Sequence, residues 1–273
     1  MRQRRPAGEP YSRRESPTRR GFAESSPSPR SIHRFAMAVA RGVVARERGA
    51  MTTTANPIST AAAVAAAAGP AGGALGVAAG AVGRRLLARL RRGARVRAPV
   101  CELSTGALWA VTGGLWGVGR LPTAWLPVLL GLGWLGVAAG LVDARHRRLP
   151  DTLTAPAACL APLGLLPLGP AAVGRGVLGA FVAVLGYGLV HLLRPAALGL
   201  GDVKLAAPLG TVLGGASWSA LAIGAVLAAV ITGCVALLRL CVSRAPPHAA
   251  VPHGPSMLAA AWLLTLATAA GGG

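Results

Sequence analysis

Two aspartates, Asp143 and Asp202, have surroundings that favour chemistry. Beyond residue 50 the sequence contains four acidic residues, namely Glu102, Asp143, Asp151 and Asp202. Asp143 ends one apolar stretch, and Asp202 begins another directly after Gly199-Leu200-Gly201. A carboxylate that is drawn into hydrocarbon costs about 2.5–3.5 kcal/mol or more. Acids at the mouths of apolar helices are therefore candidate functional residues.

The two positions should give the two carboxylates different acidities. An anion at a helix C-terminus faces the negative end of the helix dipole, so capping does not explain Asp143. Asp202 and Asp151 each precede an apolar stretch, where the alternative role of a helix cap is open to both. If Asp143 and Asp202 meet, their pKa values are pushed apart, and one can act as an acid while the other acts as a base toward water. Gly199 and Gly201 would leave room beside Asp202 for the backbone of a peptide.

The composition is typical of a membrane protein. Of 273 residues, 53% are hydrophobic and 13% are charged, whereas soluble domains have about 25% charged residues. Apolar runs approach the length of about 20 residues that crosses a bilayer as a helix. We predict an all-α fold, a polytopic integral membrane helical bundle with about 7–8 transmembrane helices. The predicted spans are residues 58–82, 100–119, 122–142, 152–168, 173–193, 203–213, 216–242 and 254–270.

The net charge of +20 is a topology signal in this context. Twelve of the 28 basic residues lie in the first 50 positions, and most others lie in short loops between apolar runs. If residues 84–97 are cytoplasmic, the inner regions hold fourteen basic residues and the outer loops hold two, Arg120 and Arg175. This asymmetry satisfies the positive-inside rule. It predicts the inner (cytoplasmic) membrane as the location, a lipid bilayer but no nucleic acid as a partner, and a cytoplasmic position for the three aspartates beyond residue 140.

Three regions are expected along the chain. Residues 1–50, rich in Arg, Ser and Pro, are predicted to be a disordered basic extension. The topology above puts this extension outside, against the positive-inside rule, so we expect a mis-assigned start with Met51 as the true one; a genuine extension is the alternative. Residues 51–98 would form the first span and a cytoplasmic Arg-rich loop. Residues 99–270 would form the membrane domain that carries the acids.

The cysteines do not indicate a metal site. The four are Cys101, Cys159, Cys234 and Cys241, and no two of them form a Cys-x-x-Cys pair. Zinc sites in proteins are commonly built on such closely spaced pairs. We therefore predict no metal and no other cofactor.

Four short stretches together resemble a known family. Residues 199–205, GLGDVKL, resemble the GxGD signature of the type IV prepilin leader peptidases, which are membrane aspartic proteases. Asp143, followed by LPDTLT at 149–154, is similar to their first catalytic block. ELSTG at 102–106 and VPHGP at 251–255 agree with two further blocks. All four occur in family order between residues 95 and 270, so residues 99–270 are identified with the catalytic domain.

The resemblance implies that Asp143 and Asp202 form a catalytic dyad. It also implies supporting roles at the site for five other residues: Gly199, Gly201, Lys204, Asp151 and Glu102. For Glu102 the implied role is to orient the site or a basic leader, and a carboxylate that snorkels to the membrane interface is the alternative.

The expected function is removal of the short basic leader from pilin-like precursors, of type IV pili or protein secretion, at the cytoplasmic membrane face. Long members of this family carry paired Cys-x-x-Cys motifs that are linked to methylation. Because this sequence has no such pair, N-methyltransferase activity is not expected. Two other classes stay open: a transporter with an aspartate relay for protons or cations, and a non-catalytic membrane scaffold. The oligomeric state and the pilin that is processed do not follow from the sequence.

Overall fold

The computed structural model describes residues 57–90, 96–146, 149–195, 198–242 and 251–271. All of them belong to the second of two units into which the chain divides, residues 56–273. The predicted disordered extension and the alternative start at Met51 lie outside the described residues.

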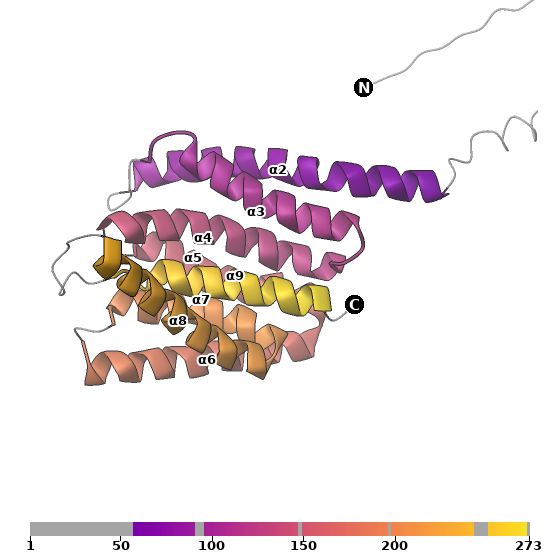
Figure 1. The fold of residues 1–273 in the computed structure, drawn as a ribbon. Helices are drawn as coiled ribbons and strands as arrows, with labels where there is room; N and C mark the ends of the chain where they lie inside the picture. The colour runs from indigo at the N-terminus through magenta and orange to yellow at the C-terminus, as the bar shows by residue number, and fades with distance from the viewer. Residues whose placement is uncertain (1–56, 91–95, 147–148, 196–197, 243–250, 272–273) are drawn as a thin grey trace, which may run out of the picture. The chain divides into compact units, whose positions relative to one another are not determined.

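The described part of the chain consists of helices and their connections. They are α2 (Pro57–Arg89), α3 (Val100–Gly117), η1 (Thr123–Trp125), α4 (Leu126–His146), α5 (Asp151–Gly164), η2 (Leu166–Leu168), α6 (Pro170–Leu193), α7 (Leu200–Ala216), α8 (Trp218–Val242) and α9 (Gly254–Gly271). The helices lie side by side, with α4 and α9 between the α2–α3 pair and the group formed by α6, α7 and α8 (Figure 1).

Six of the described helices are long and apolar enough to cross a membrane. These candidate spans are Ala62–Arg89, Thr123–His146, Asp151–Leu168, Pro170–Leu193, Trp218–Val242 and Gly254–Gly271. The prediction of an all-α polytopic membrane bundle is confirmed. The predicted number of spans was higher, because α3 and α7 were also counted. The 17 residues of α7 reach about 25 Å at 1.5 Å per residue, which is less than the hydrocarbon core of about 30 Å.

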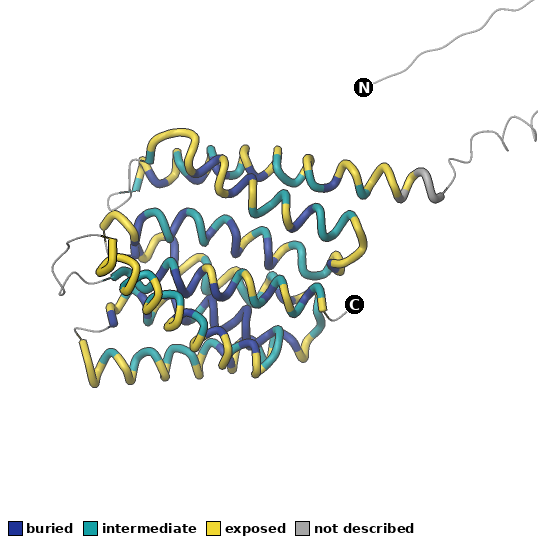
Figure 2. Tube along the Cα trace, in the orientation of Figure 1, coloured by how far each residue is buried: buried dark blue, intermediate teal, exposed yellow. Residues whose placement is uncertain are grey.

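Helix α7 forms the centre of the bundle. Eleven of its 17 residues are buried, among them Leu205, Leu209 and Leu213 (Figure 2). It packs against α5, α6, α8 and α9. By contrast, α6 and α8 present large apolar side chains such as Phe181 and Val226 on their outer surfaces, as helices in contact with lipid do. The first turn of α7, which carries Asp202, is therefore held in place by its neighbours.

Glycines allow α6 and α7 to lie in close contact. A Cβ at Gly179 would be 2.6 Å from the carbonyl oxygen of Gly210 and 2.8 Å from Cα of Gly214. These are backbone atoms, so the two helices would have to separate to admit a methyl group. Small residues at helix contacts are the usual means of close packing in membranes, where burial of apolar surface contributes little.

We expect Gly179→Ala to destabilise the bundle by about 1–3 kcal/mol, because overpacking forces the two backbones apart. Thermal unfolding of the purified protein in detergent measures this change. Gly174→Ala on the same helix is the matched control, since a Cβ there meets nothing within 4 Å. Equal melting temperatures for the two variants would contradict the close contact between α6 and α7.

Candidate active site

Asp143 lies near the C-terminal end of α4 with its carboxylate against the start of α9. Its residue surface is 5% exposed. A Cβ at Gly254, the first residue of α9, would be 2.7 Å from Oδ2 and 3.2 Å from Cγ of Asp143. Glycine at position 254 therefore lets α9 begin directly beside this carboxylate.

Asp202 lies in the first turn of α7 and is 8% exposed. The backbone N–H of Gly199 donates a hydrogen bond to its Oδ2, with a distance of 3.3 Å. The sequence interpretation placed Asp202 before the helix as a cap. In the structure the helix begins at Leu200 with Gly199 as its N-cap residue, so Asp202 is the third helical residue and reaches back to the cap. This capping bond leaves the carboxylate at the surface of the first turn, where it can meet another group.

The two carboxylates lie close together at the first turns of α7 and α9, which both contact Leu149. Their charges are close enough to interact. Leu149, from the segment between α4 and α5, provides an independent observation. Its Cδ1 lies 3.5 Å from the place of a Cβ at Gly201 and 3.4 Å from the place of one at Gly254. Gly201 adjoins Asp202 and Gly254 faces Asp143, so Leu149 brings the two acids to one location.

The helix dipoles around the pair partly offset one another. Asp143 is at the negative end of α4, which disfavours its charge, while the positive end of α9 begins beside it. Asp202 is at the positive end of α7. The backbone N–H of Gly254 acts on the Asp143 carboxyl group, although the buried Oδ2, like Oε2 of Glu102, has no partner within hydrogen-bond geometry among the described residues. The arrangement favours one negative charge shared by two carboxyl groups.

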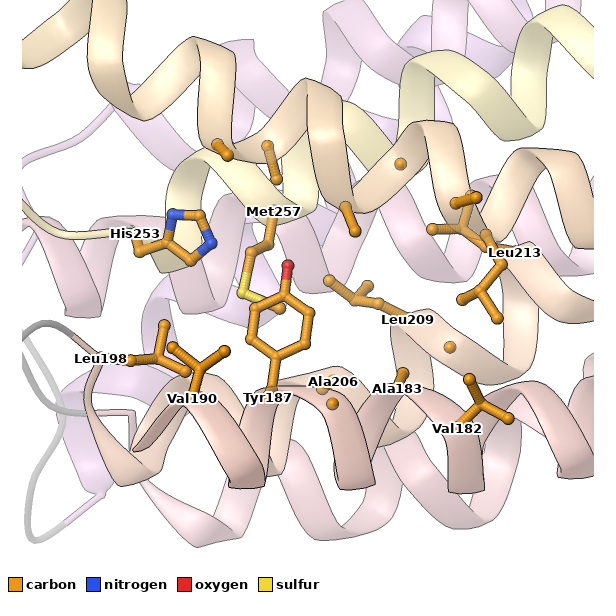
Figure 3. A pocket seen from close by; sticks show the side chains of 18 of the residues that line it. Val182, Ala183, Tyr187, Val190, Leu198, Ala206, Leu209, Leu213, His253 and Met257 are labelled. Carbon is orange, nitrogen blue, oxygen red and sulfur yellow. The ribbon is translucent and has the colours of Figure 1, made fainter. Parts of the chain in front are cut away.

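His253 and Tyr187 border the pair on the side of α6 and α8. The ring centroids of His253 and Tyr187 are 6.0 Å apart, and Figure 3 shows both rings at the same end of one cavity. Nδ1 of His253 is 2.7 Å from Oγ1 of Thr232 on α8. The Thr232 hydroxyl also lies 2.9 Å from the carbonyl oxygen of Ala228. When it donates to that carbonyl, Nδ1 of His253 is the donor to Thr232.

His253 is therefore best described as a neutral imidazole. Burial lowers the pKa of His253, and the nearby Asp143 carboxylate opposes this shift in part. In the neutral ring with hydrogen on Nδ1, Nε2 is a hydrogen-bond acceptor. The motif VPHGP at 251–255 is visible in the sequence, but nothing in it indicates a role for His253 or Gly254. Their positions next to Asp143 depend on contacts between distant segments.

Lys204 and Asp151, both predicted as supporting residues, pair with each other. Nζ of Lys204 donates to Oδ1 of Asp151 at 2.6 Å, and both side chains are exposed. The cap role that was left open for Asp151 is not supported, since the N-cap of α5 is Pro150 and makes no side-chain cap bond. An exposed ion pair contributes about 0–1 kcal/mol. The pair links the starts of α5 and α7.

Glu102 is held by α2. Nε of Arg84 donates to its Oε1 at 2.6 Å. Glu102 is 8% exposed, so the alternative of a carboxylate that snorkels into water is wrong. The structure thus assigns Glu102 to the contact between α2 and α3, and its contact with Arg84 does not involve the aspartate pair.

Gly201 does not have the surroundings that the sequence interpretation gave it. A Cβ at Gly201 would touch Cβ, Cδ1 and N of Leu149 at 3.4–3.5 Å, so the neighbouring backbone belongs to this chain. Among the described glycines, positive φ occurs at Gly119 and Gly169. The backbone at Gly201 therefore places no left-handed conformation in the way of a side chain. Gly254 is the glycine at which an added Cβ would come too close to a carboxylate, at 2.7 Å from Oδ2 of Asp143.

The described residues contain no group of three or more His, Cys, Asp or Glu side chains that could hold a metal ion. Fold and site together define a polytopic helical membrane protein in which two buried aspartates meet at the ends of helices.

The comparisons with known proteins point to one family. Residues 129–238, which include both aspartates, match the type IV leader peptidase family. The chain is 37% identical over 132 residues to a prepilin leader peptidase/N-methyltransferase of Klebsiella pneumoniae. This match covers 46% of the chain and 54% of the relative, so the chain spans about half the length of the curated relative that it matches. No solved structure matches the chain. The resemblance to the prepilin leader peptidases is confirmed over the matched region.

Proposed function

We propose that this protein is a membrane aspartic endopeptidase that removes the short basic leader of type IV prepilin-like precursors. The observation that carries the proposal is the meeting of two buried aspartates, Asp143 and Asp202, within the region that matches the family. The name of the relative supports prepilin as the substrate class. The proposed activity is hydrolysis of a peptide bond, and the methyltransferase activity in the name of the relative is not part of it.

In the proposed reaction the two carboxyl groups share one proton. The ionised carboxylate accepts a proton from a water molecule, whose oxygen attacks the scissile carbonyl carbon. The protonated partner donates its proton to the departing amine when the carbon–nitrogen bond breaks. Hydrolysis returns the pair to one proton and one charge. Each such proton transfer typically contributes about 100- to 10,000-fold to the rate.

The other two classes are less well supported. A relay for ions across the membrane would place its acids near the middle of the bilayer, whereas Asp143 and Asp202 lie at helix ends. A scaffold gives no reason for two buried carboxylates from different helices to lie close together.

Co-expression tests the proposed function. A precursor with a basic leader, a glycine and a following apolar helix should lose its leader in cells that make this protein, as seen by a mobility shift and by the new N-terminus. A precursor that stays intact while the protein is present in the membrane would contradict the proposal.

The orientation is also part of the proposal, with the aspartates facing the cytoplasm. It is supported by the fourteen basic residues that this topology places inside and the two that it places outside, in keeping with the positive-inside rule. In a variant without its four native cysteines, Arg120→Cys should react with a membrane-impermeant thiol reagent in intact cells. Leu200→Cys, also at an exposed position, should react after the membrane is permeabilised. The reverse pattern would place the pair outside.

A further inference from the structure

A groove lies between α6, α7, α8 and α9 with a volume of about 610 Å³. Its floor is buried and is formed by Leu209 and Leu213 of α7 and Met257 of α9. Its rims carry exposed residues, Gly186 on α6 and Ala225 on α8. Because α6 and α8 are lipid-facing helices with few contacts to each other, the groove opens sideways toward the bilayer.

One end of the groove is lined by His253 and Tyr187, the neighbours of the aspartate pair, while the aspartates themselves are not part of its lining. Leu213 lies at the other end (Figure 3). The charge of Asp143 acts on His253, and that of Asp202 acts on Tyr187. Along α7 the floor follows Asp202 by eleven residues to Leu213, which is about 17 Å at 1.5 Å per residue. A chain bound at the aspartates can therefore continue directly into the groove.

The lining fits a helix that enters from lipid. Gly186, Ala222, Ala225 and Ala229 form the rims with small side chains. Residues of this size let a second helix approach closely, which is the main source of attraction between helices in a membrane. His253 and Tyr187, the polar residues at the end near the aspartates, could bind the start of such a helix. The first backbone N–H groups of a helix have no partner within the helix, and in hydrocarbon each must find an acceptor.

His253 is built to supply such an acceptor. With the Thr232 hydroxyl donating to Ala228, Nδ1 of His253 carries the hydrogen, and Nε2 then presents a lone pair. Figure 3 shows this second ring nitrogen directed into the groove, toward Tyr187.

We propose that the groove binds the apolar helix that follows the scissile bond of the precursor, and that His253 Nε2 accepts a hydrogen bond from an N–H at the start of that helix. The inference rests on the proposed function and adds the part of the substrate that the bundle itself recognises. His253 is then a positioning residue, which holds the scissile bond at the aspartates.

A second cavity provides a matched control. It lies on the other side of α7, has a volume of about 630 Å³, and is lined by residues such as Leu132, Ala161 and Val212. His253 and Tyr187, which line the groove, are not part of the lining of this second cavity. If the precursor helix bound to any apolar cavity, both cavities would contact it equally.

Photo-crosslinking in the full-length protein tests the proposal. The photoreactive residue p-benzoylphenylalanine replaces Ala225 in the groove or Ala161 in the second cavity, in the Asp202→Asn background that retains substrate. The probe is a co-expressed precursor with a basic leader, a glycine and an apolar helix. We expect a crosslink to the precursor helix from position 225 and none from position 161. Equal crosslinking from both positions, a crosslink to a second copy of this chain, or adducts with lipid alone would overturn the inference.

Cleavage by the unmodified protein distinguishes a failure of the groove assignment from a failure of the proposed function. If it cleaves the precursor but position 225 does not crosslink to it, the groove assignment fails and the proposed function stands. If it does not cleave the precursor, the proposed function fails and the inference fails with it.

Kinetics test the role of His253. His253→Leu leaves an N–H without an acceptor, so KM should rise by about tenfold or more, with a smaller change in kcat. His253→Gln keeps an acceptor oxygen at a similar reach and should restore KM to within about threefold. A loss confined to kcat, or no rescue by glutamine, would contradict a role in binding the helix.

Discussion

Asparagine at position 143 or 202 is expected to abolish cleavage of the precursor, with a loss of about 100- to 10,000-fold for either change. The amide has nearly the shape of the carboxyl group but neither takes up nor releases a proton near neutral pH. Both acids are buried, and the fold should tolerate a neutral group there because it removes a charge from a site that disfavours two. The double variant should be little worse than either single one, since groups that act as a unit lose their effect together.

Asp151→Asn is the matched control for this prediction. Its carboxylate is exposed and pairs with Lys204, so its loss removes a contact worth about 0–1 kcal/mol. Cleavage should stay within about threefold of the parent rate. Membrane content and cleaved fraction need to be measured in the same cells. Substantial cleavage by Asp143→Asn or Asp202→Asn would exclude the aspartate mechanism.

Gly254→Ala is expected to reduce cleavage by about 100-fold, the effect of displacing a catalytic group by about 1 Å. The new Cβ would lie 2.7 Å from Oδ2 of Asp143. Because the Asp143 side chain is short and buried, either its carboxylate rotates away from the site or α9 is displaced. Either response separates it from Asp202. The protein should still reach the membrane, because one methyl group at the first residue of a helix does not disrupt the bundle.

Gly199→Ala tests whether the effect is specific to the site of contact. A Cβ at Gly199 would lie 3.7 Å from Oδ2 of Asp202, which is an ordinary van der Waals distance. Both variants add the same methyl group next to one acid of the pair. We expect cleavage by Gly199→Ala to stay within about threefold of the parent rate. Similar rates for Gly199→Ala and Gly254→Ala would contradict the position of α9 against Asp143.

The sequence was sufficient to predict the bundle, because spans in a membrane are long apolar helices whose composition is local information. It also singled out Asp143 and Asp202, since acids are rare beyond residue 50 and each of these two sits at the edge of an apolar stretch. The predicted short span at 203–213 was an underestimate. Asp202 is part of the first turn of α7, which begins at Leu200. A span predicted from hydropathy begins after the charged residue, so the first turn of the helix was left out.

The surroundings of the acids could not be predicted in the same way. The contact of Gly254 with Asp143 joins residues more than 100 positions apart. Leu149 lies about 50 positions before its contact at the start of α7 and about 100 before its contact at the start of α9. The room beside Gly201 was assigned to a substrate, although Leu149 occupies it. A glycine in a sequence indicates that something approaches closely, but the approaching partner is defined by the tertiary packing.

Hydrolysis by the purified protein is the most direct test of the central claim that Asp143 and Asp202 activate water at a peptide bond. The protein, reconstituted in lipid vesicles without added metal or cofactor, is incubated with the purified precursor in water enriched in oxygen-18, and both products are weighed by mass spectrometry. We predict a leader peptide whose new carboxylate carries the heavy oxygen, a mature product with a free amine, and neither product with the Asp143→Asn or Asp202→Asn protein. Cleavage by either asparagine variant, or an intact precursor after incubation with the unaltered protein, would contradict the claim.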